Sequence, residues 1–220
     1  MPALSVWLAA LAVAASATMA VVAAHRDDRR GVYVFKPLTT ILVIVATLWI
    51  FGPATRRYQD LILLGLALSL AGDVFLMLPR DRFVAGLASF LAAHVAYIAA
   101  FTLGVGFAPA QLPWLAPFAF FGLMVVVYLW RGLPDAALKG AVAAYVVVIV
   151  AMAWRAAVRA RSPTLPLTTA AAALGGAVLF LASDSVLAID RFRRPFRAAQ
   201  PVVLATYWAA QFLIGLSVRG

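Results

Sequence analysis

The sequence contains no cysteine, which excludes disulfide bonds, thiolate metal sites and a cysteine nucleophile. It also has little charge, because only 12% of its 220 residues are Asp, Glu, Lys or Arg while 65% are hydrophobic. A soluble domain would carry roughly twice that charged fraction. The HExxH, GxSxG and P-loop patterns are absent as well, so a zinc protease, an α/β-hydrolase and a nucleoside triphosphatase have no support.

The chain consists instead of long apolar runs separated by short basic gaps. Runs of about 17 to 25 residues cross a bilayer as helices, which satisfy their backbone hydrogen bonds internally. We therefore predict an all-α, polytopic membrane protein with a single transmembrane domain over residues 1–220. The first run lacks the basic region of a signal peptide, so we expect it to be retained. The eight predicted spans are 4–24, 33–52, 61–78, 83–103, 112–130, 138–155, 167–189 and 201–218.

The net charge of +10 is distributed unevenly between the two ends of these spans. One side has twelve basic residues: Arg26, Arg29, Arg30, Lys36, Arg80, Arg82, Arg131, Lys139, Arg191, Arg193, Arg194 and Arg197. The other has six: Arg56, Arg57, Arg155, Arg159, Arg161 and Arg219. The positive-inside rule places the twelve-charge side in the cytoplasm and both termini outside. Such charges face anionic lipid headgroups, and we predict no nucleic-acid partner.

Two aspartates lie inside apolar spans, Asp73 in the third and Asp184 in the seventh. An intramembrane carboxylate is costly to insert and by default marks a functional site. If these spans end near 78 and 189, each aspartate lies roughly 7 to 8 Å below the cytoplasmic end of its helix. The two aspartates therefore form the first part of the predicted site.

The surroundings of the two aspartates are similar in sequence. Asp73 is followed by a basic turn with Arg82 and by a span containing His94, and Asp184 by a basic turn with Arg191 and a last span containing Tyr207. An offset of four spans would give the two halves the same direction through the membrane, as in a parallel 4+4 repeat. Chance matching of small and apolar residues is the alternative.

Other polar side chains are predicted to lie near the aspartates. His94 and Tyr97 share one helix face, as do Tyr207 and Gln211, while Lys36 opens the second span at the cytoplasmic surface. Together these groups predict one cavity open to the cytoplasmic leaflet.

Several other polar residues in the spans receive a structural interpretation. We expect Tyr128 and Tyr145 to be packing or interfacial aromatics. Ser69, Ser89 and Ser185 are expected to bond back to the preceding helical turn.

Paired carboxylates in a low-dielectric site can differ in protonation, so that one acts as an acid and the other as a base. Such a pair suits cleavage of an acetal-like or ether bond through an oxocarbenium ion. A proton-coupled transporter of a small molecule or lipid would also use paired intramembrane aspartates. A third possibility is a metal-dependent hydrolase with His94, Asp73 and Asp184 as ligands.

An ordered set of short motifs resembles the lysoplasmalogenase family, also called YhhN-like membrane proteins. The set covers about residues 31–215 and comprises Lys36-Pro37-Leu38-Thr39-Thr40, Ser69-Leu70-Ala71-Gly72-Asp73, Phe83-Val84-Ala85-Gly86-Leu87 with His94 and Tyr97, Ser183-Asp184, and Tyr207 with Gln211. The resemblance implies an eight-helix membrane hydrolase that cleaves the vinyl ether bond of lysoplasmalogens. The products would be a fatty aldehyde and a glycerophospho-ethanolamine or -choline, and no cofactor or metal is expected.

This resemblance leads to a hypothesis for each site residue. Asp184 would be the protonated acid, Asp73 the ionised partner that stabilises the cation and activates water, and His94 a proton shuttle. The residues expected to bind substrate are Lys36 at the phosphate, Tyr207 and Gln211 at the glycerol oxygens, and Tyr97. The expected partners are a lysophospholipid and the bilayer, and the Ala- and Arg-rich composition suggests a bacterial inner membrane.

Overall fold

The computed structural model describes residues 2–53, 55–79 and 82–219. Within them eight helices are long and apolar enough to cross a membrane, in agreement with the predicted all-α fold. Two short 3-10 helices, η1 (Pro109–Leu115) and η2 (Trp130–Gly132), flank the fifth α-helix. The α-helices are α1 Pro2–His25, α2 Arg29–Trp49, α3 Arg56–Met77, α4 Phe83–Thr102, α5 Ala116–Leu129, α6 Ala136–Ala160, α7 Leu167–Phe192 and α8 Ala199–Leu216.

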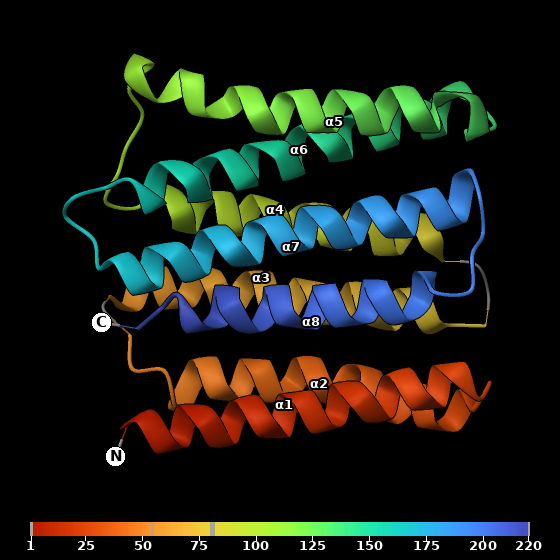
Figure 1. Cartoon of the computed structure of the whole chain (residues 1–220), viewed down its shortest axis with the longest axis horizontal. Helices are drawn as coiled ribbons and strands as arrows, with labels where there is room; N and C mark the ends of the chain where they lie inside the picture. Colours follow the sequence, from red (N-terminus) through yellow and green to blue (C-terminus); the bar gives the residue numbers. More distant parts are fainter. Residues whose placement is uncertain (1, 54, 80–81, 220) are drawn as a thin grey trace.

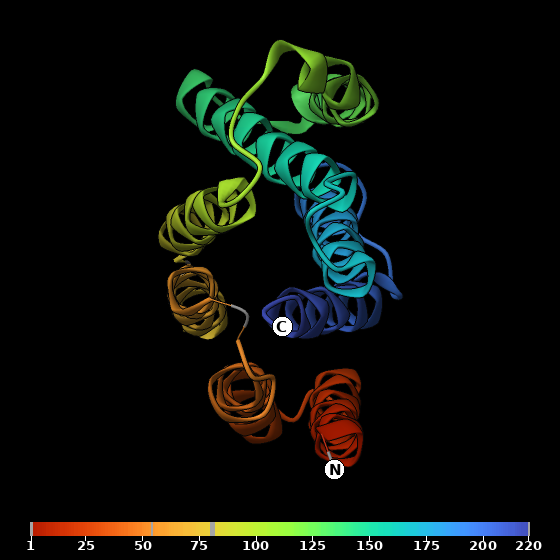
Figure 2. The ribbon, with the colours of Figure 1, turned by 90° about the vertical axis from the view of Figure 1, so that its left-hand side faces the viewer.

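The helices run side by side along one common direction (Figure 1). Viewed along that direction, α2, α3 and α4 form one row, and α1, α8 and α7 form a second row facing it (Figure 2). Helix α6 contacts both α4 and α7 and so closes the space between the rows, and α5 packs outside α6. Helix α8 contacts α2 and α3 across the rows, so α3, α4, α7 and α8 surround the centre of the bundle.

The predicted span boundaries differ from the helices mainly at charged residues. Helix α2 begins at Arg29 rather than residue 33, and α3 begins at Arg56 rather than residue 61. Hydropathy excludes these arginines from a span, but arginine is a good helix former and the first turn tolerates it. Asp28 and Thr55 cap the two helices by accepting hydrogen bonds from the backbone N–H groups of Arg30 and Tyr58.

The fifth predicted span, 112–130, corresponds to the apolar segment Pro109–Gly132, which is not one continuous α-helix. It is a composite segment in which η1 leads into α5 and η2 follows it. Pro113 lies inside η1, where it cannot donate a backbone hydrogen bond to a regular α-helix. The whole apolar segment, Pro109–Gly132, is nevertheless long enough to span a membrane.

Helices α6 and α7 continue further than predicted, and this changes two estimates. Because α7 ends at Phe192, Asp184 lies about 12 Å from the end of its helix, whereas Asp73 lies about 6 Å from the end of α3. The equal depths estimated from the predicted helix ends were therefore wrong. Because α6 ends at Ala160, Arg155 and Arg159 belong to a helix and not to a connection.

Small residues bring neighbouring helices close together, next to Asp73 in the α3–α4 pair and about two helical turns from Asp184 in the α7–α8 pair. A Cβ atom on Gly72 of α3 would lie 2.7 Å from the Phe90 ring of α4. A Cβ atom on Gly176 of α7 would lie 2.7 Å from Ile214 of α8. Neither position could accept a side chain without a shift, so these glycines hold the α3–α4 and α7–α8 pairs in close contact.

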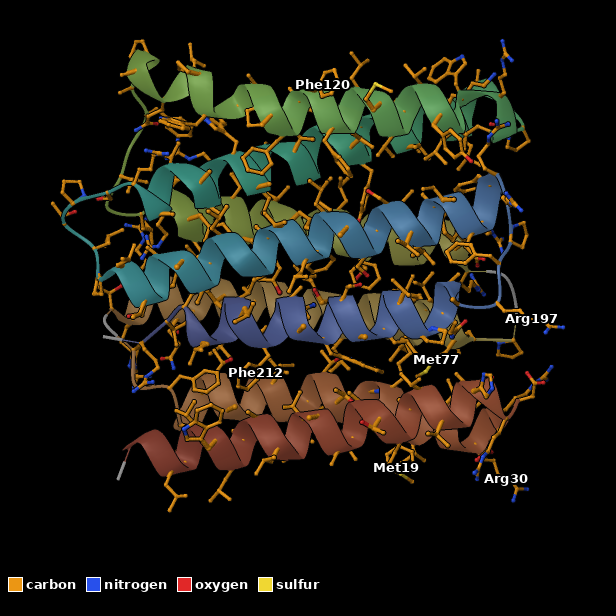
Figure 3. The ribbon with its side chains drawn as sticks, viewed as in Figure 1. Met19, Arg30, Met77, Phe120, Arg197 and Phe212 are labelled. Atoms are coloured by element: carbon orange, nitrogen blue, oxygen red, sulfur yellow. The ribbon has the colours of Figure 1, made fainter. Side chains whose placement is uncertain are left out.

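The basic connections gather at one end of the bundle. Arg30, in the first turn of α2, and Arg197, between α7 and α8, lie at the same end of the bundle (Figure 3). Arg80, which is part of the predicted twelve-charge side, lies outside the described residues. The orientation relative to the cytoplasm stays a prediction from the positive-inside rule.

Candidate active site

Asp73 is surrounded by hydrogen-bond donors. Its Oδ2 accepts hydrogen bonds from Thr40 Oγ1 at 2.9 Å and from the Tyr207 hydroxyl at 2.7 Å. Its Oδ1 lies 3.5 Å from Lys36 Nζ. The side chain is only 2% exposed, and these three donors match the acceptor capacity of an ionised carboxylate.

Asp184 has fewer partners and is more open. Its Oδ2 accepts a short hydrogen bond from the Tyr145 hydroxyl and lies 3.9 Å from His94 Nε2. The side chain is 15% exposed, compared with 2% for Asp73. No cation of the kind that faces Asp73 is paired with Asp184 among the described residues.

A cavity that we call the polar chamber connects the two aspartates. It encloses about 1300 Å³, including space open to the exterior. Its wall also contains Pro79, Arg82, Asp190 and Arg191, so it opens at the end of the bundle where α3 connects to α4 and α7 to α8. Four predicted site residues line it together: Lys36, Asp73, Asp184 and Tyr207.

A second cavity, the apolar groove, also reaches Asp184. It lies between α4, α5, α6 and α7 and encloses about 680 Å³, again including open space. Its wall includes Leu87, Val125, Leu129, Val146, Ile149 and Leu181. Asp184 is the only acidic or basic residue of the described chain that lines the groove, and it lines the polar chamber as well.

His94 lies behind Asp184 in an aromatic environment. The imidazole is fully buried, and its ring packs edge-on against Phe180 and Tyr145, with centroids 4.6 and 5.3 Å away. Neither of its ring nitrogens has a hydrogen-bond partner among the described residues. Its 3.9 Å separation from Asp184 is within reach of a proton relay after a small shift or through one water molecule.

Tyr97 and Gln211 lie deeper than the chamber. The Tyr97 hydroxyl donates to Gln211 Oε1 at 2.8 Å, and both side chains are fully buried. Neither residue lines the polar chamber or the apolar groove as described. The structure thus brings five of the seven predicted site residues together and places this pair in the packing between α4 and α8.

Two site residues are absent from the sequence-based prediction. Tyr145 was interpreted as a packing or interfacial aromatic, but its hydroxyl contacts Asp184 from α6. Thr40 was part of a family motif without an assigned role, and it donates to Asp73. Lys36 also differs from expectation, because α2 begins at Arg29 and Lys36 lies within the helix, 12% exposed, rather than at its start.

The predicted hydrogen bonds from serine hydroxyls to the preceding helical turn are confirmed at one of three positions. Ser185 donates to Leu181 O in the preceding turn at 2.7 Å. Ser89 instead donates to Leu68 O across the α3–α4 interface at 2.6 Å. Ser69 shares neither pattern, because its buried hydroxyl has no hydrogen-bond partner among the described residues.

A metal site made of His94, Asp73 and Asp184 does not fit the geometry. Within residues 2–53, 55–79 and 82–219, no three His, Cys, Asp or Glu side chains are grouped so that they could hold an ion. Both Asp73 oxygens already face donors. A ligand role for Asp73 would require these donors to be displaced.

The opposite end of α6 carries two buried arginines. Arg155 donates to Thr102 Oγ1 at 3.1 Å, to Gln111 Oε1 at 2.8 Å and to Gly106 O, all in or beside the α4–α5 connection. Arg159 donates to Leu103 O at 2.9 Å and lies over the Tyr58 ring. These two residues were counted among the exposed basic residues of one side, but they are 1% and 8% exposed. They close the end of the bundle opposite the polar chamber.

The contacts around the two aspartates follow a common plan. Asp73 on α3 contacts Thr40 on α2 and Tyr207 on α8, and Asp184 on α7 contacts Tyr145 on α6 and His94 on α4. Each aspartate therefore contacts the preceding helix of its own half and the last helix of the other half. This arrangement is compatible with the predicted parallel 4+4 repeat.

Comparisons with known proteins agree with the resemblance in the sequence. A family model described as the YhhN family matches residues 31–218. The chain is 37% identical to lysoplasmalogenase TMEM86B of Homo sapiens over 182 residues, which cover 80% of this chain and 71% of the relative. It is 30% identical to the Escherichia coli protein named uncharacterized membrane protein YhhN over 207 residues, 93% and 95% of the two chains. No solved structure matches the chain.

Proposed function

Because the chain belongs to the YhhN family, we propose that it is a membrane-embedded hydrolase that cleaves the vinyl ether bond of lysoplasmalogens. The relatives named lysoplasmalogenase support this activity. The observation that carries it is the position of Asp184 where the polar chamber meets the apolar groove. A lysolipid likewise has a polar part and an apolar part, and in a lysoplasmalogen the vinyl ether bond lies between the polar headgroup and the single hydrocarbon chain. We place the protein in a bacterial inner membrane.

The polar chamber suits the glycerophosphate part of such a substrate. Lys36, Arg82 and Arg191 line it and would attract the phosphate. Lys36 has three donor hydrogens, so it can face Asp73 and still donate to a phosphate oxygen. Tyr207 donates to Asp73, and its hydroxyl oxygen can accept a hydrogen bond from the glycerol. Tyr97 and Gln211 would act by positioning α4 and α8, since they bond to each other behind the chamber.

The proposed reaction begins with proton transfer from Asp184 to the β-carbon of the vinyl ether. This step converts the ether into an oxocarbenium ion and leaves Asp184 as a carboxylate. The ionised Asp73 stabilises the positive charge and accepts a proton from the water that attacks the cationic carbon. The resulting hemiacetal collapses to a fatty aldehyde and a free glycerol hydroxyl, as its hydroxyl proton passes to the departing glycerol oxygen. The proton that Asp73 took from the water then returns to Asp184 with His94 as the relay, so that both aspartates regain their starting states.

The arrangement of partners supports these roles for the two aspartates. Asp73 faces Lys36 and accepts two hydroxyl hydrogen bonds, an environment that stabilises an ionised carboxylate. Asp184 faces a single hydroxyl group and a buried imidazole, and an apolar wall adjoins it. The groove would hold the β-carbon of the vinyl ether next to Asp184, whose ionised form has fewer stabilising partners than that of Asp73.

The direct test is to incubate the purified protein with a lysoplasmalogen, its ester analogue and its saturated alkyl ether analogue. Mass spectrometry should detect a fatty aldehyde from the vinyl ether alone, because only that bond forms the stabilised cation after protonation. Fatty acid from the ester would contradict the proposed chemistry. Uptake of substrate into vesicles without product would instead identify a transporter.

A further inference from the structure

The apolar groove has a wall suited to hydrocarbon and nothing else. Asp184 apart, its polar groups are the hydroxyls of Tyr145 and Ser185, and both are already used as donors, to Asp184 and to Leu181 O. A ligand that lies beyond Asp184 would therefore meet only apolar side chains. Burial of a hydrocarbon chain there would be favourable by about fourfold in affinity per methylene.

The groove has a defined direction. The residues it shares with the polar chamber are Leu76, Phe83, Phe90, Asp184 and Leu187. Much of its remaining wall lies on α5 and α6, where the lining residues run from Leu129 to Gly122 and from Val142 to Ile149, about 10 Å along each helix. A ligand with its polar end in the chamber would thus direct its apolar end past Asp184 between α5 and α6.

The deep end of the groove is narrow. A Cβ atom on Gly122 would lie 2.6 Å from Val150 and 2.9 Å from Val146, so α5 and α6 are in close contact there. Toward the α5–α6 connection, Val125 and Leu129 of α5 and Val142 of α6 line the groove. A single chain can lie between them, and the contact at Gly122 limits how far it can extend.

The outer wall of the groove is one helix thick. On α5, Leu123 and Val127 are 60% and 61% exposed, whereas Leu129 is buried and lines the groove. Phe120, further along the same helix, also points away from the bundle (Figure 3). A hydrocarbon chain could therefore pass from the bilayer into the groove beside α5 without crossing a polar barrier.

We infer that the apolar groove binds the single hydrocarbon chain of a lysolipid, and that Val125 and Val146 set the chain length the protein accepts. This inference rests on the proposed function, because it assumes that the headgroup occupies the polar chamber. It adds the tail-binding site and two residues that determine specificity. A two-chain phospholipid would bind poorly, since the groove narrows to the Gly122 contact.

A binding experiment tests the inference without any reaction. The probe is a saturated alkyl-ether lysophospholipid with a diazirine at the chain end, added to the purified full chain in nanodiscs. After illumination, mass spectrometry should locate the label in peptides of α5 and α6 near Val125 and Val146. An excess of unmodified lysolipid should remove the label. Label confined to other helices, or removed equally well by a two-chain phospholipid, would overturn the inference.

Substitutions at matched positions sharpen this test. Val125→Phe should fill the groove and reduce labelling by a long-chain probe at least tenfold, because several methylenes lose their contacts. Val127→Phe adds the same side chain on the exposed face of α5 and should leave the labelling unchanged. Val125→Ala enlarges the groove and should shift the protein's preference toward probes with longer chains. This variant still tests the inference if Val125→Phe fails to fold. Equal labelling of all three variants would refute a role for Val125.

Hydrolysis provides a separate measurement. With a series of vinyl ether lipids at constant mole fraction in mixed micelles, Val125→Phe should move the best substrate to a shorter chain. If the protein hydrolyses the vinyl ether but the diazirine probe labels only residues outside the groove, the tail-binding site is refuted and the proposed function stands. Label in the groove without any hydrolysis would refute the proposed reaction and leave the tail-binding site intact.

Discussion

The two intramembrane aspartates occupy related positions but have different surroundings. Asp73 faces an ammonium group and two hydroxyl donors and is almost completely buried. Asp184 has one hydroxyl donor, a nearby imidazole and an apolar cavity on one side. Because both line the same chamber, the difference lies in the partners that each neighbouring helix supplies. This difference in partners is the basis for the proposal that Asp73 is the ionised group and Asp184 the proton donor.

The strongest test of this comparison is removal of the proposed acid. Asp184→Asn should lower aldehyde release by about 10²–10⁴-fold, the usual contribution of a positioned acid or base. Aldehyde release should be measured on purified protein whose folding has been verified by circular dichroism.

Asp190→Asn is the matched control for that variant. Asp190 also lines the polar chamber, and its Oδ1 accepts a hydrogen bond from Phe196 N that an amide oxygen would preserve. Activity close to that of the parent chain is expected for this control. An active Asp184→Asn protein would eliminate Asp184 as the acid.

The second prediction concerns the charge pair at Asp73. Lys36→Met would leave Asp73 buried without its cation and should lower the free energy of unfolding by about 3–5 kcal/mol. The double variant Lys36→Met with Asp73→Asn should recover most of this loss, because no uncompensated charge remains. Unfolding in mixed micelles by titration with a denaturing detergent would measure both. If the double variant is as unstable as the single one, Asp73 is not held as an ion by Lys36.

A smaller effect is expected from the two tyrosines that contact the aspartates. Tyr145→Phe removes the one hydroxyl group that donates a hydrogen bond to Asp184. Turnover should fall about tenfold, which corresponds to the roughly 1–2 kcal/mol of a buried hydrogen bond. Tyr207→Phe should have less effect, since Asp73 keeps Thr40 and Lys36. Steady-state rates of aldehyde release would compare the variants.

Tyr128→Phe serves as the control for the tyrosine variants. This side chain is 47% exposed and should tolerate loss of its hydroxyl without a change in rate. A larger loss for Tyr207→Phe than for Tyr145→Phe would reverse the assignment of the two aspartates.

The smallest effect is expected from chelation. The donors around both Asp73 oxygens leave this carboxylate unsuited to bind a divalent cation, so dialysis against EDTA should not change the rate of aldehyde release. Inductively coupled plasma mass spectrometry of the dialysed protein would verify removal of metals. Activity that disappears and returns with one added metal would instead favour His94 and Asp184 as ligands.

The features that the sequence predicts well are those that depend on local composition. Apolar runs of sufficient length predicted all eight helices, and buried charges in them directed attention to Asp73 and Asp184. The start of α2 was misplaced because hydropathy treats Arg29 as a boundary although the helix includes it. This error placed Lys36 at the surface, whereas seven residues of helix precede it and its ammonium group reaches Asp73.

The contacts of Tyr145 could not be predicted in the same way. A tyrosine in an apolar run has the same local pattern whether it packs or donates to a carboxylate. Its partner is 39 residues away on another helix, so only the packing of α6 against α7 reveals the pair. Arg155 is a similar case, because its hydrogen-bond acceptors lie at the end of α4 and in the segment that follows it, and it had been counted as a surface charge.

Arg155 and Arg159, the two buried arginines at the far end of α6, have a consequence for the order in which the bundle assembles. No Lys, Arg, Asp or Glu occurs from Phe83 to Trp130, so the connection between the fourth and fifth spans contains no such charge, while Arg82 and Arg131 flank the two spans at their other ends. Arg155 and Arg159 are synthesised later and bind that connection through Leu103, Gly106 and Gln111. The α4–α5 connection thus obtains its hydrogen bonds to Arg155 and Arg159 only after α6, a helix synthesised later, has packed against it.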